Sequence, residues 1–276
     1  MKIDAVLSPA ELPALARRDL RDATCVVFDV LRATSTFVTA LHHGAKAIVP
    51  VSEIAEALAL RQKQPDILLG GERDGVRIRA GQTGGIDFDL GNSPREYTPE
   101  KVRGKTIVST TTNGTRALRA CTGAPTILAA SFLNLTATAQ FIRQLHPAQI
   151  VLVCAGTREN IAIEDMLAAG ALGEMLNRWG ETTGEPKGEQ NPQRSGSRGR
   201  SPHLNAVYEL SNSVETAHNA WRKAKGNLLE VVSEAENARR LLAIPELRDD
   251  VAFCLRQDVN NLIAALGHDG AIRILV

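Results

Sequence analysis

The sequence predicts an α/β protein built as three layers, α/β/α, with helices on both faces of a mainly parallel or mixed sheet. Two observations lead to this prediction. Short apolar runs rich in β-branched residues, such as residues 26–30 and 150–154, alternate with longer segments whose apolar residues recur at helical spacing. Such alternation is typical of a sheet that helices cover on both faces. We expect one domain over residues 1–276.

The predicted elements follow one another as strands and helices along the chain. Each strand is a short apolar or alternating run, and the helices begin near polar caps or end near glycine or proline. The predicted strands cover residues 2–7, 26–30, 47–51, 67–69, 106–108, 125–130, 150–154 and 270–276. The predicted helices cover residues 9–20, 36–43, 54–63, 116–120, 133–145, 164–176 and most of 203–236. The expected N-caps include Ser8, Ser52, Ser213 and Ser233.

Composition and charge exclude several classes of function. The chain has 32 basic and 31 acidic residues, so its net charge of +1 does not indicate a nucleic-acid partner. No stretch approaches the ~18 uninterrupted apolar residues of a membrane span, and the N-terminus lacks a signal-peptide core. We therefore expect no membrane partner and a cytoplasmic location. The four cysteines lie far apart without a CxxC pair, so neither a zinc site nor a redox motif is predicted.

Residues 181–203 change composition sharply to Gly, Pro, Ser, Gln and charged residues. Such a segment buries too little apolar surface to fold, so we expect a flexible insertion. Its three arginines and one lysine could contact an acidic partner, although a solvated insertion is the more common case. The sequence is silent on the oligomeric state, and a homodimer stays open.

The stretch VVFDVLRATST, residues 26–36, places Asp29 and Arg32 where a buried strand gives way to a helix. In open α/β sheets, ligands usually bind beyond the carboxyl ends of the strands. A carboxylate there can hold a divalent cation, and an arginine can hold a phosphate. The alternative is a surface ion pair beside an ordinary N-cap, and this stretch alone does not separate the two.

Two later segments repeat this pattern of polar residues after a strand. Glu72 and Arg73 follow a glycine pair that would let a ligand approach the backbone, although the segment also fits a hairpin turn. In the loop DLGNSP, Asn92 and Ser93 can donate to an anion or bond their own backbone.

The turn STTTNGT, residues 109–115, follows the strand at 106–108 and presents many donors to one point. Its candidate ligands for a phosphate or sulfonate are Thr110, Thr111, Thr112, Asn113, Gly114 and Thr115. The alternative is an N-cap with more polar residues than it needs. After the strand at 150–154 come Arg158, Glu164 and Asp165, whose acids could instead be ordinary partners of the helix dipole.

Taken together, these motifs resemble the 2-phosphosulfolactate phosphatase family, the ComB-like magnesium-dependent acid phosphatases of coenzyme M biosynthesis. The resemblance covers most of the chain in order and is far more specific than any single motif. It runs through FDVLRATST (28–36), GGER (70–73), DLGNSP (89–94), STTTNGT (109–115), CAG with a later ED (154–156, 164–165) and DDVAFCLRQD (249–258). The insertion and the long AGQTGG approach to Asp87 depart from the family pattern without touching a charged motif.

The resemblance implies a Mg²⁺-dependent phosphatase that hydrolyses the phosphate ester of a three-carbon sulfonated acid to 3-sulfolactate and phosphate. Carboxylate oxygens suit a hard cation, and arginines with a hydroxyl-rich turn suit a phosphoryl group. The implied catalytic residues are Asp29, Arg32, Glu72 and Arg73. The implied metal ligands are Asp29, Glu72 and either Glu164 or Asp165. The implied substrate ligands are Asn92, Ser93, the residues from Thr110 to Thr115, and Arg158.

The nucleophile could be a Mg²⁺-activated water or the carboxylate of Asp29. The haloacid-dehalogenase type of phosphatase places a second Asp two positions after its nucleophile, where this chain has Leu31. This difference favours water. A second class of function is a catalytically idle module that binds a small polyanionic metabolite.

Overall fold

The sheet is mixed and consists of two parallel parts that an antiparallel hairpin joins. In the computed structural model, which describes residues 2–182 and 208–275, eleven strands lie in the order β5-β4-β6-β3-β11-β10-β7-β2-β8-β1-β9. The strands are β1 (Lys2–Val6), β2 (Ala23–Phe28), β3 (Ala47–Val51), β4 (Leu68–Arg73), β5 (Val76–Arg77), β6 (Thr106–Thr110), β7 (Thr126–Ala130), β8 (Gln149–Cys154), β9 (Glu209–Leu210), β10 (Ala264–Leu266) and β11 (Ile272–Ile274). Strands β10 and β11 pair antiparallel with each other. Strand β10 also pairs antiparallel with β7, and β11 pairs antiparallel with β3.

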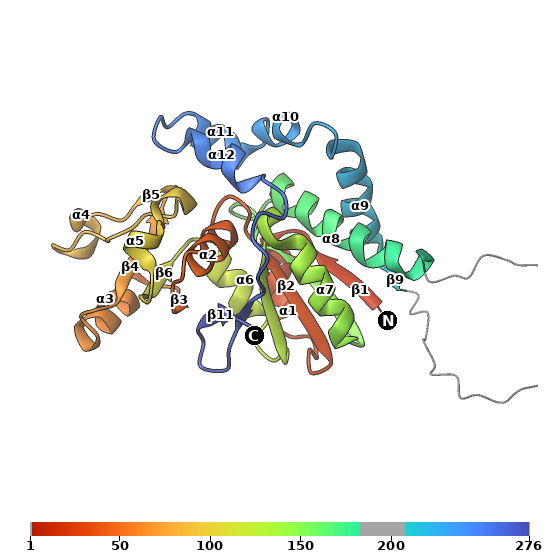
Figure 1. Ribbon diagram of the computed structural model, residues 1–276, viewed down its shortest axis with the longest axis horizontal. Coiled ribbons are helices and arrows are strands. Elements are labelled where there is room, and N and C mark those ends of the chain that lie inside the picture. Colours follow the sequence, from red (N-terminus) through yellow and green to blue (C-terminus); the bar gives the residue numbers. More distant parts are fainter. Residues whose placement is uncertain (1, 183–207, 276) are drawn as a thin grey trace, which may run out of the picture.

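Helices cover both faces of the larger parallel part, as Figure 1 shows, and the α/β prediction is confirmed. The α-helices are α1 (Leu12–Leu15), α2 (Ala33–His42), α3 (Ile54–Lys63), α4 (Ala80–Thr83), α5 (Pro99–Val102), α6 (Gly114–Ala120), α7 (Leu135–Leu145), α8 (Ile163–Thr182), α9 (Asn212–Ala224), α10 (Leu228–Ser233), α11 (Glu236–Leu242) and α12 (Arg248–Cys254). The 3-10 helices are η1 (Pro9–Glu11), η2 (Pro94–Glu96) and η3 (Phe132–Asn134).

Strand β2 explains how one short sequence supports two cores. All six of its residues are buried, and successive side chains of a strand point to opposite faces. Val26 and Phe28 belong to the core under α7, α8 and α9. Cys25 and Val27 belong to the core under α1, α2 and α6. A continuous apolar run is therefore what this central strand requires.

The helices near the C-terminus of the chain lead back to the carboxyl edge of the sheet. In α9, Val214, Ala217 and Trp221 are buried at helical spacing and pack against α8. A Cβ on Gly170 would lie 2.1 Å from the Ala217 carbonyl oxygen, so the close approach of α8 and α9 requires glycine there. In Figure 1, α10, α11 and α12 then lie above the ends of the central strands.

Several local predictions need correction. The helix expected over residues 9–20 is wrong beyond Leu15, because Arg17 and Arg18 donate to the third carbonyl back and the chain leaves the helix as a turn. Ser8 is confirmed as an N-cap, accepting from Ala10 N–H.

The other serine caps are wrong because the helices begin at different residues. Glu53 precedes α3, and Ser211, not Ser213, accepts from Val214 N–H at the start of α9. Ser233 ends α10.

The antiparallel strand β10 and the two-residue strand β9 were not predicted, and the two-residue strand β5 was expected only in the hairpin alternative. Each has three residues or fewer, too short for a periodic pattern. The predicted insertion at 181–203 lies outside the described residues except for its first two positions, which end α8. Across the described residues, no helix has the length and apolar character needed to cross a bilayer.

Candidate active site

The carboxyl ends of β2, β4, β6 and β8 and the helix α11 surround one cavity of about 360 Å³. Its polar walls come from segments that are far apart in the sequence. The lining residues are Asp29, Leu31, Arg32, Glu72, Asp74, Gly75, Asn92, Thr112, Asn113, Thr157, Arg158, Asn237, Arg240, Leu241, Ala243 and Ile244. The placement matches the expectation that ligands bind beyond the strand ends.

Asp29 directly follows β2 and is held rigidly at the start of α2. Its carboxylate accepts from Ala33 N–H at 3.1 Å, and its own N–H donates to the Thr34 hydroxyl at 3.0 Å. Burial, together with the negative charges of Glu72 and Glu164, raises the pKa of Asp29 to about 7. Asp29 is therefore a buried acid whose ionised form needs a compensating cation.

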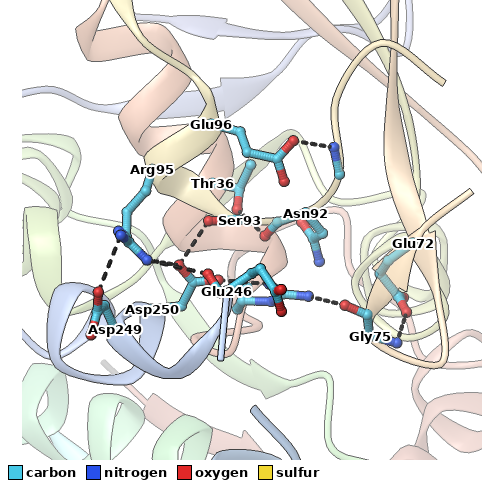
Figure 2. A network of polar contacts seen from close by, with 12 residues as sticks. Thr36, Glu72, Gly75, Asn92, Ser93, Arg95, Glu96, Glu246, Asp249 and Asp250 are labelled. Carbon is cyan, nitrogen blue, oxygen red and sulfur yellow. Dashed lines mark hydrogen bonds and ion pairs between the residues drawn. The ribbon is translucent and has the colours of Figure 1, made fainter. Parts of the chain in front are cut away.

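Glu72 connects the turn of the β4–β5 hairpin with the turn after β6. Its Oε2 accepts from Gly75 N–H at 2.7 Å, as Figure 2 shows, and its Oε1 accepts from the N–H and hydroxyl of Thr112, both at 3.0 Å. Strands β4 and β5 pair antiparallel through Glu72 and Arg77. The hairpin interpretation of this segment is therefore confirmed, and the hairpin positions Glu72 in the cavity wall, where its role in a site stays a prediction.

Glu164 and Asp165 open α8, but their oxygens have different partners. Asp165 accepts from Val30 N–H at 2.7 Å and from Gly156 N–H at 3.0 Å, so it joins the loops after β2 and β8. Glu164 accepts from the Asn237 amide at 2.8 Å through Oε1, while its buried Oε2 has no hydrogen-bond partner in the described residues. Burial raises the pKa of both carboxyls. Of the two, Glu164 has the spare oxygen.

The carboxylates of Asp29, Glu72 and Glu164 are the kind of ligand that a hard cation prefers, but they are not arranged as a complete metal site. Among residues 2–182 and 208–275, no group of three or more His, Cys, Asp and Glu side chains is arranged to hold a metal. Asp29, Glu72 and Glu164 nevertheless interact strongly enough that the other two raise the pKa of Asp29. A divalent cation would relieve this repulsion and give the orphan Glu164 oxygen a partner. Mg²⁺ therefore fits the donor set and stays a prediction.

Arg32 lines the cavity, but its guanidinium is already engaged. It forms an ion pair with Asp250 of α12 and donates to the Gly75 carbonyl. The Ser93 hydroxyl donates to the other Asp250 oxygen at 2.7 Å. Figure 2 shows this network, in which Arg95 also approaches Asp250. Ser93 therefore supports the ion pair and is not part of the cavity wall.

The hydroxyl-rich turn divides between the cavity and its support. Thr112 and Asn113 line the cavity, and the side-chain oxygens of Asn113 and Asn92 are buried without a hydrogen-bond partner in the described residues. Thr111 and Thr115 contact each other through their hydroxyls at 3.5 Å. A Cβ on Gly114 would lie 2.8 Å from Asp29 Oδ2. Only glycine lets the turn pass this close to Asp29.

Arg73 lies outside the cavity wall, in contrast with its predicted place beside Glu72. Its guanidinium donates to the Thr110 hydroxyl at 3.0 Å and to the Ser52 carbonyl at 3.2 Å. Side chains alternate along a strand, so Glu72 and Arg73 point to opposite faces of β4. Thr110 is likewise engaged with Ser52 and Arg73, and any catalytic role for Arg73 stays a prediction.

Helix α11 contributes residues that the sequence did not indicate. Asn237 donates to Glu164 and to the Thr157 hydroxyl, and Arg240 lines the cavity. Arg158, which was predicted, also lines it and pairs with Glu236 at 3.3 Å. No local motif marks Asn237 or Arg240. Asp250, by contrast, lies in the DDVAFCLRQD motif, so the sequence indicated this segment but not what Asp250 does.

Comparison with known proteins decides the family. A family model described as 2-phosphosulpholactate phosphatase matches residues 10–268. The chain belongs to the 2-phosphosulfolactate phosphatase family. The cavity, its acidic wall and the Arg32–Asp250 pair are thus features of a member of this family.

Three curated relatives match over nearly their whole length, and each is named a probable 2-phosphosulfolactate phosphatase. One from Caldanaerobacter subterraneus is 34% identical over 93% of this chain and 92% of its own. One from Thermotoga maritima is 34% identical over 96% and 95%, respectively. One from Synechococcus is 33% identical over 99% of this chain and 100% of its own. Membership of the family therefore extends through both parts of the sheet and α11.

Proposed function

We propose that this chain is a Mg²⁺-dependent phosphatase that hydrolyses 2-phospho-3-sulfolactate, or a related small acidic phosphate monoester, to 3-sulfolactate and phosphate. The observation that supports it most is that Asp29 and Glu72 line one cavity at the carboxyl edge of the sheet, where the negative charges of Glu72 and Glu164 act on Asp29. Three buried carboxylates that form no ion pair within the described residues suit a hard cation better than a structural role. The relatives' names supply the substrate class, and the proposal includes the place in coenzyme M biosynthesis and the cytoplasmic location that the sequence led us to expect.

Residues of this chain position the reactants. Bound Mg²⁺ would supply charge neutralisation for the phosphate oxygens and activation of the attacking group. Asn92 and Asn113 line the cavity together with Thr112, and their side-chain N–H groups can donate to phosphate oxygens. Gly114 keeps the turn close to Asp29, and Asp165 fixes the two strand-end loops. The polar wall can therefore orient a phosphate ester without moving the backbone.

We favour water as the nucleophile, with a carboxylate as general base. A carboxylate of the site that the cation does not bind would accept the proton of the attacking water. The site two residues after Asp29 is Leu31, an apolar part of the wall, so no second acid stands there to assist a covalent aspartyl phosphate. Acid quench during turnover of a substrate with radiolabelled phosphate separates the two routes, because label bound covalently to the protein would overturn the water route.

The test of the proposal is phosphate release from 2-phospho-3-sulfolactate with and without EDTA. We expect EDTA to abolish turnover and Mg²⁺ to restore it. Asp29→Asn and Glu72→Gln should each lower kcat by about two orders of magnitude or more, the scale lost with one electrostatic group of a catalytic site. Tight calorimetric binding of sulfolactate with no turnover of any phosphorylated analogue would overturn catalysis in favour of a polyanion-binding module.

A further inference from the structure

Three arginines line the cavity, and two of them already have an acidic partner. Arg32 is neutralised by Asp250 in a buried ion pair. Arg158 is 74% exposed and pairs with Glu236. Arg240, on α11, is half-buried and makes no hydrogen bond or ion pair in the described part of the chain. Arg240 is thus the cavity cation whose charge is available to a ligand.

The position of Arg240 relates it to the acidic wall. Its Nη2 lies 3.8 Å from the point where a Cβ on Gly75 would stand, beside the turn of the β4–β5 hairpin. The N–H of Gly75 donates to Glu72, and its carbonyl accepts from Arg32. Arg240 therefore reaches from α11 to the same turn that fixes the carboxylate of Glu72.

The surroundings of Arg240 strengthen its interaction with an anion. Leu241, Ala243 and Ile244, which follow it in the chain, also line the cavity, so the wall that this part of the chain supplies is largely apolar. A charge beside low-dielectric surface is less screened than one in water. Guanidinium also binds carboxylate, sulfonate and phosphate oxygens through two parallel N–H groups.

The proposed substrate has a carboxylate and a sulfonate besides its phosphate, so the cavity must bind acid groups at more than one place. The phosphate belongs near Asp29, where the proposed cation offsets the carboxylates. A second acid group on the same small molecule meets α11, where the unpaired guanidinium is.

We propose that Arg240 binds the second acid group of the substrate, a carboxylate or a sulfonate, and so determines selectivity for phosphate esters of hydroxy acids over esters of neutral alcohols. This inference rests on the proposed function.

The test compares two substrates that differ at one group. Glycerol 2-phosphate has a hydroxymethyl group where 2-phosphoglycerate has a carboxylate. We expect the wild-type protein to favour 2-phosphoglycerate in kcat/KM. In Arg240→Met, the ratio of the two kcat/KM values should fall by about 10- to 100-fold, the range lost with one charge-assisted contact. The fall should arise from KM for 2-phosphoglycerate, and Arg240→Lys should recover part of it.

Arg239→Met is the matched control on the same helix. The Arg239 side chain is 65% exposed and pairs with Glu234 outside the cavity, so its loss should leave the selectivity ratio unchanged. A wild-type ratio in Arg240→Met, or an equal fall in Arg239→Met, overturns the assignment while leaving phosphatase activity intact. Absence of phosphate release from every ester by the wild-type protein is a different result, and it overturns the proposed function together with this inference.

Discussion

Arg32 Nη1 lies 2.7 Å from Asp250 Oδ2, and the two side chains are only 2% and 0% exposed. They come from the loop after β2 and from α12, at opposite ends of the sequence. The Ser93 hydroxyl and the Gly75 carbonyl complete the hydrogen bonding of the pair. The pair therefore joins α12, the β4–β5 turn and the 89–94 loop around the loop that carries Asp29.

Breaking this pair from one side should destabilise the fold strongly. Asp250→Leu leaves the Arg32 guanidinium buried without a counter-charge, which costs about 3–5 kcal/mol, whereas replacing both partners by apolar residues is often neutral. We expect urea denaturation to show that loss for Asp250→Leu and recovery of most of it in Arg32→Met/Asp250→Leu. Arg95→Ala removes only a half-exposed charge 3.7 Å from Asp250 and should cost less than about 1 kcal/mol. Equal stability of the single and double variants would show that the pair is not coupled.

The parts of the fold that the sequence predicted are those that local patterns encode. Strands β2 and β8 are continuous apolar runs, and α3 begins and ends where its pattern does. Of the hairpin that joins the two parallel parts, β11 was predicted and β10 was not. Strand β10 has three residues, and its place is determined by pairing with β7 and β11. Pairing between distant segments leaves no periodic trace in a short strand.

The candidate site likewise has residues whose place could be predicted from local patterns and residues whose place could not. Asp29 lies near the end of one predicted strand and Glu72 follows another, so their common place in the cavity wall could be inferred from the shared edge of the sheet. The direction of Arg73 and the partner of Arg32 could not be inferred, because they depend on strand pleat and on a helix 218 positions away in the sequence. Arg240 could not be found either, since α11 reaches the cavity only through tertiary packing.

Glu164 and Asp165 should respond differently to loss of charge. Asp165→Asn puts an amide donor against one of two backbone N–H groups, and an unsatisfied buried donor costs about 1–3 kcal/mol. Glu164→Gln keeps an oxygen for Asn237 while removing the charge of the orphan oxygen. We therefore expect denaturation in EDTA to show a loss for Asp165→Asn only. Mg²⁺ titration of activity should show weakened dependence for Glu164→Gln, and the reverse pattern would exchange the two roles.

Gly114→Ala should lower activity through Asp29. The new Cβ would stand 2.8 Å from Asp29 Oδ2 and 2.9 Å from the Ala33 Cβ, closer than real Cβ contacts, so Asp29 or the turn must move. Displacement of a reacting group by about 1 Å can cost about 100-fold in rate. Steady-state kinetics should show this loss in kcat. Gly81→Ala, in α4 with no heavy atom within 4 Å of its Cβ, is the matched control and should retain wild-type kinetics. Full activity of Gly114→Ala would mean that Asp29 tolerates movement.

Stability of the metal-free protein should fall as the pH rises towards neutrality. The pKa of Asp29 is about 7 in the folded protein and 3.8 as its ordinary value, so the folded state binds more protons between these values. The contribution of Asp29 is fully present below about pH 3.8 and is lost as the pH passes through about 7. Glu164 and Asp165, whose pKa values are also raised, act in the same direction. Within its window, one such group changes the free energy of unfolding by about 1.4 kcal/mol per pH unit.

Urea denaturation in EDTA at pH 5, 6, 7 and 8 measures this slope. We expect Asp29→Asn to flatten it relative to wild type, because the amide does not titrate. The pKa of the exposed Asp19 is lowered to about 2, so its titration is complete below this range and Asp19→Asn should keep the wild-type slope. Mg²⁺ binds the ionised carboxylates of the folded state and should therefore stabilise the wild-type protein most at pH 7 to 8. A slope that Asp29→Asn leaves unchanged, or a Mg²⁺ effect that does not grow with pH, would contradict a shared cation at Asp29.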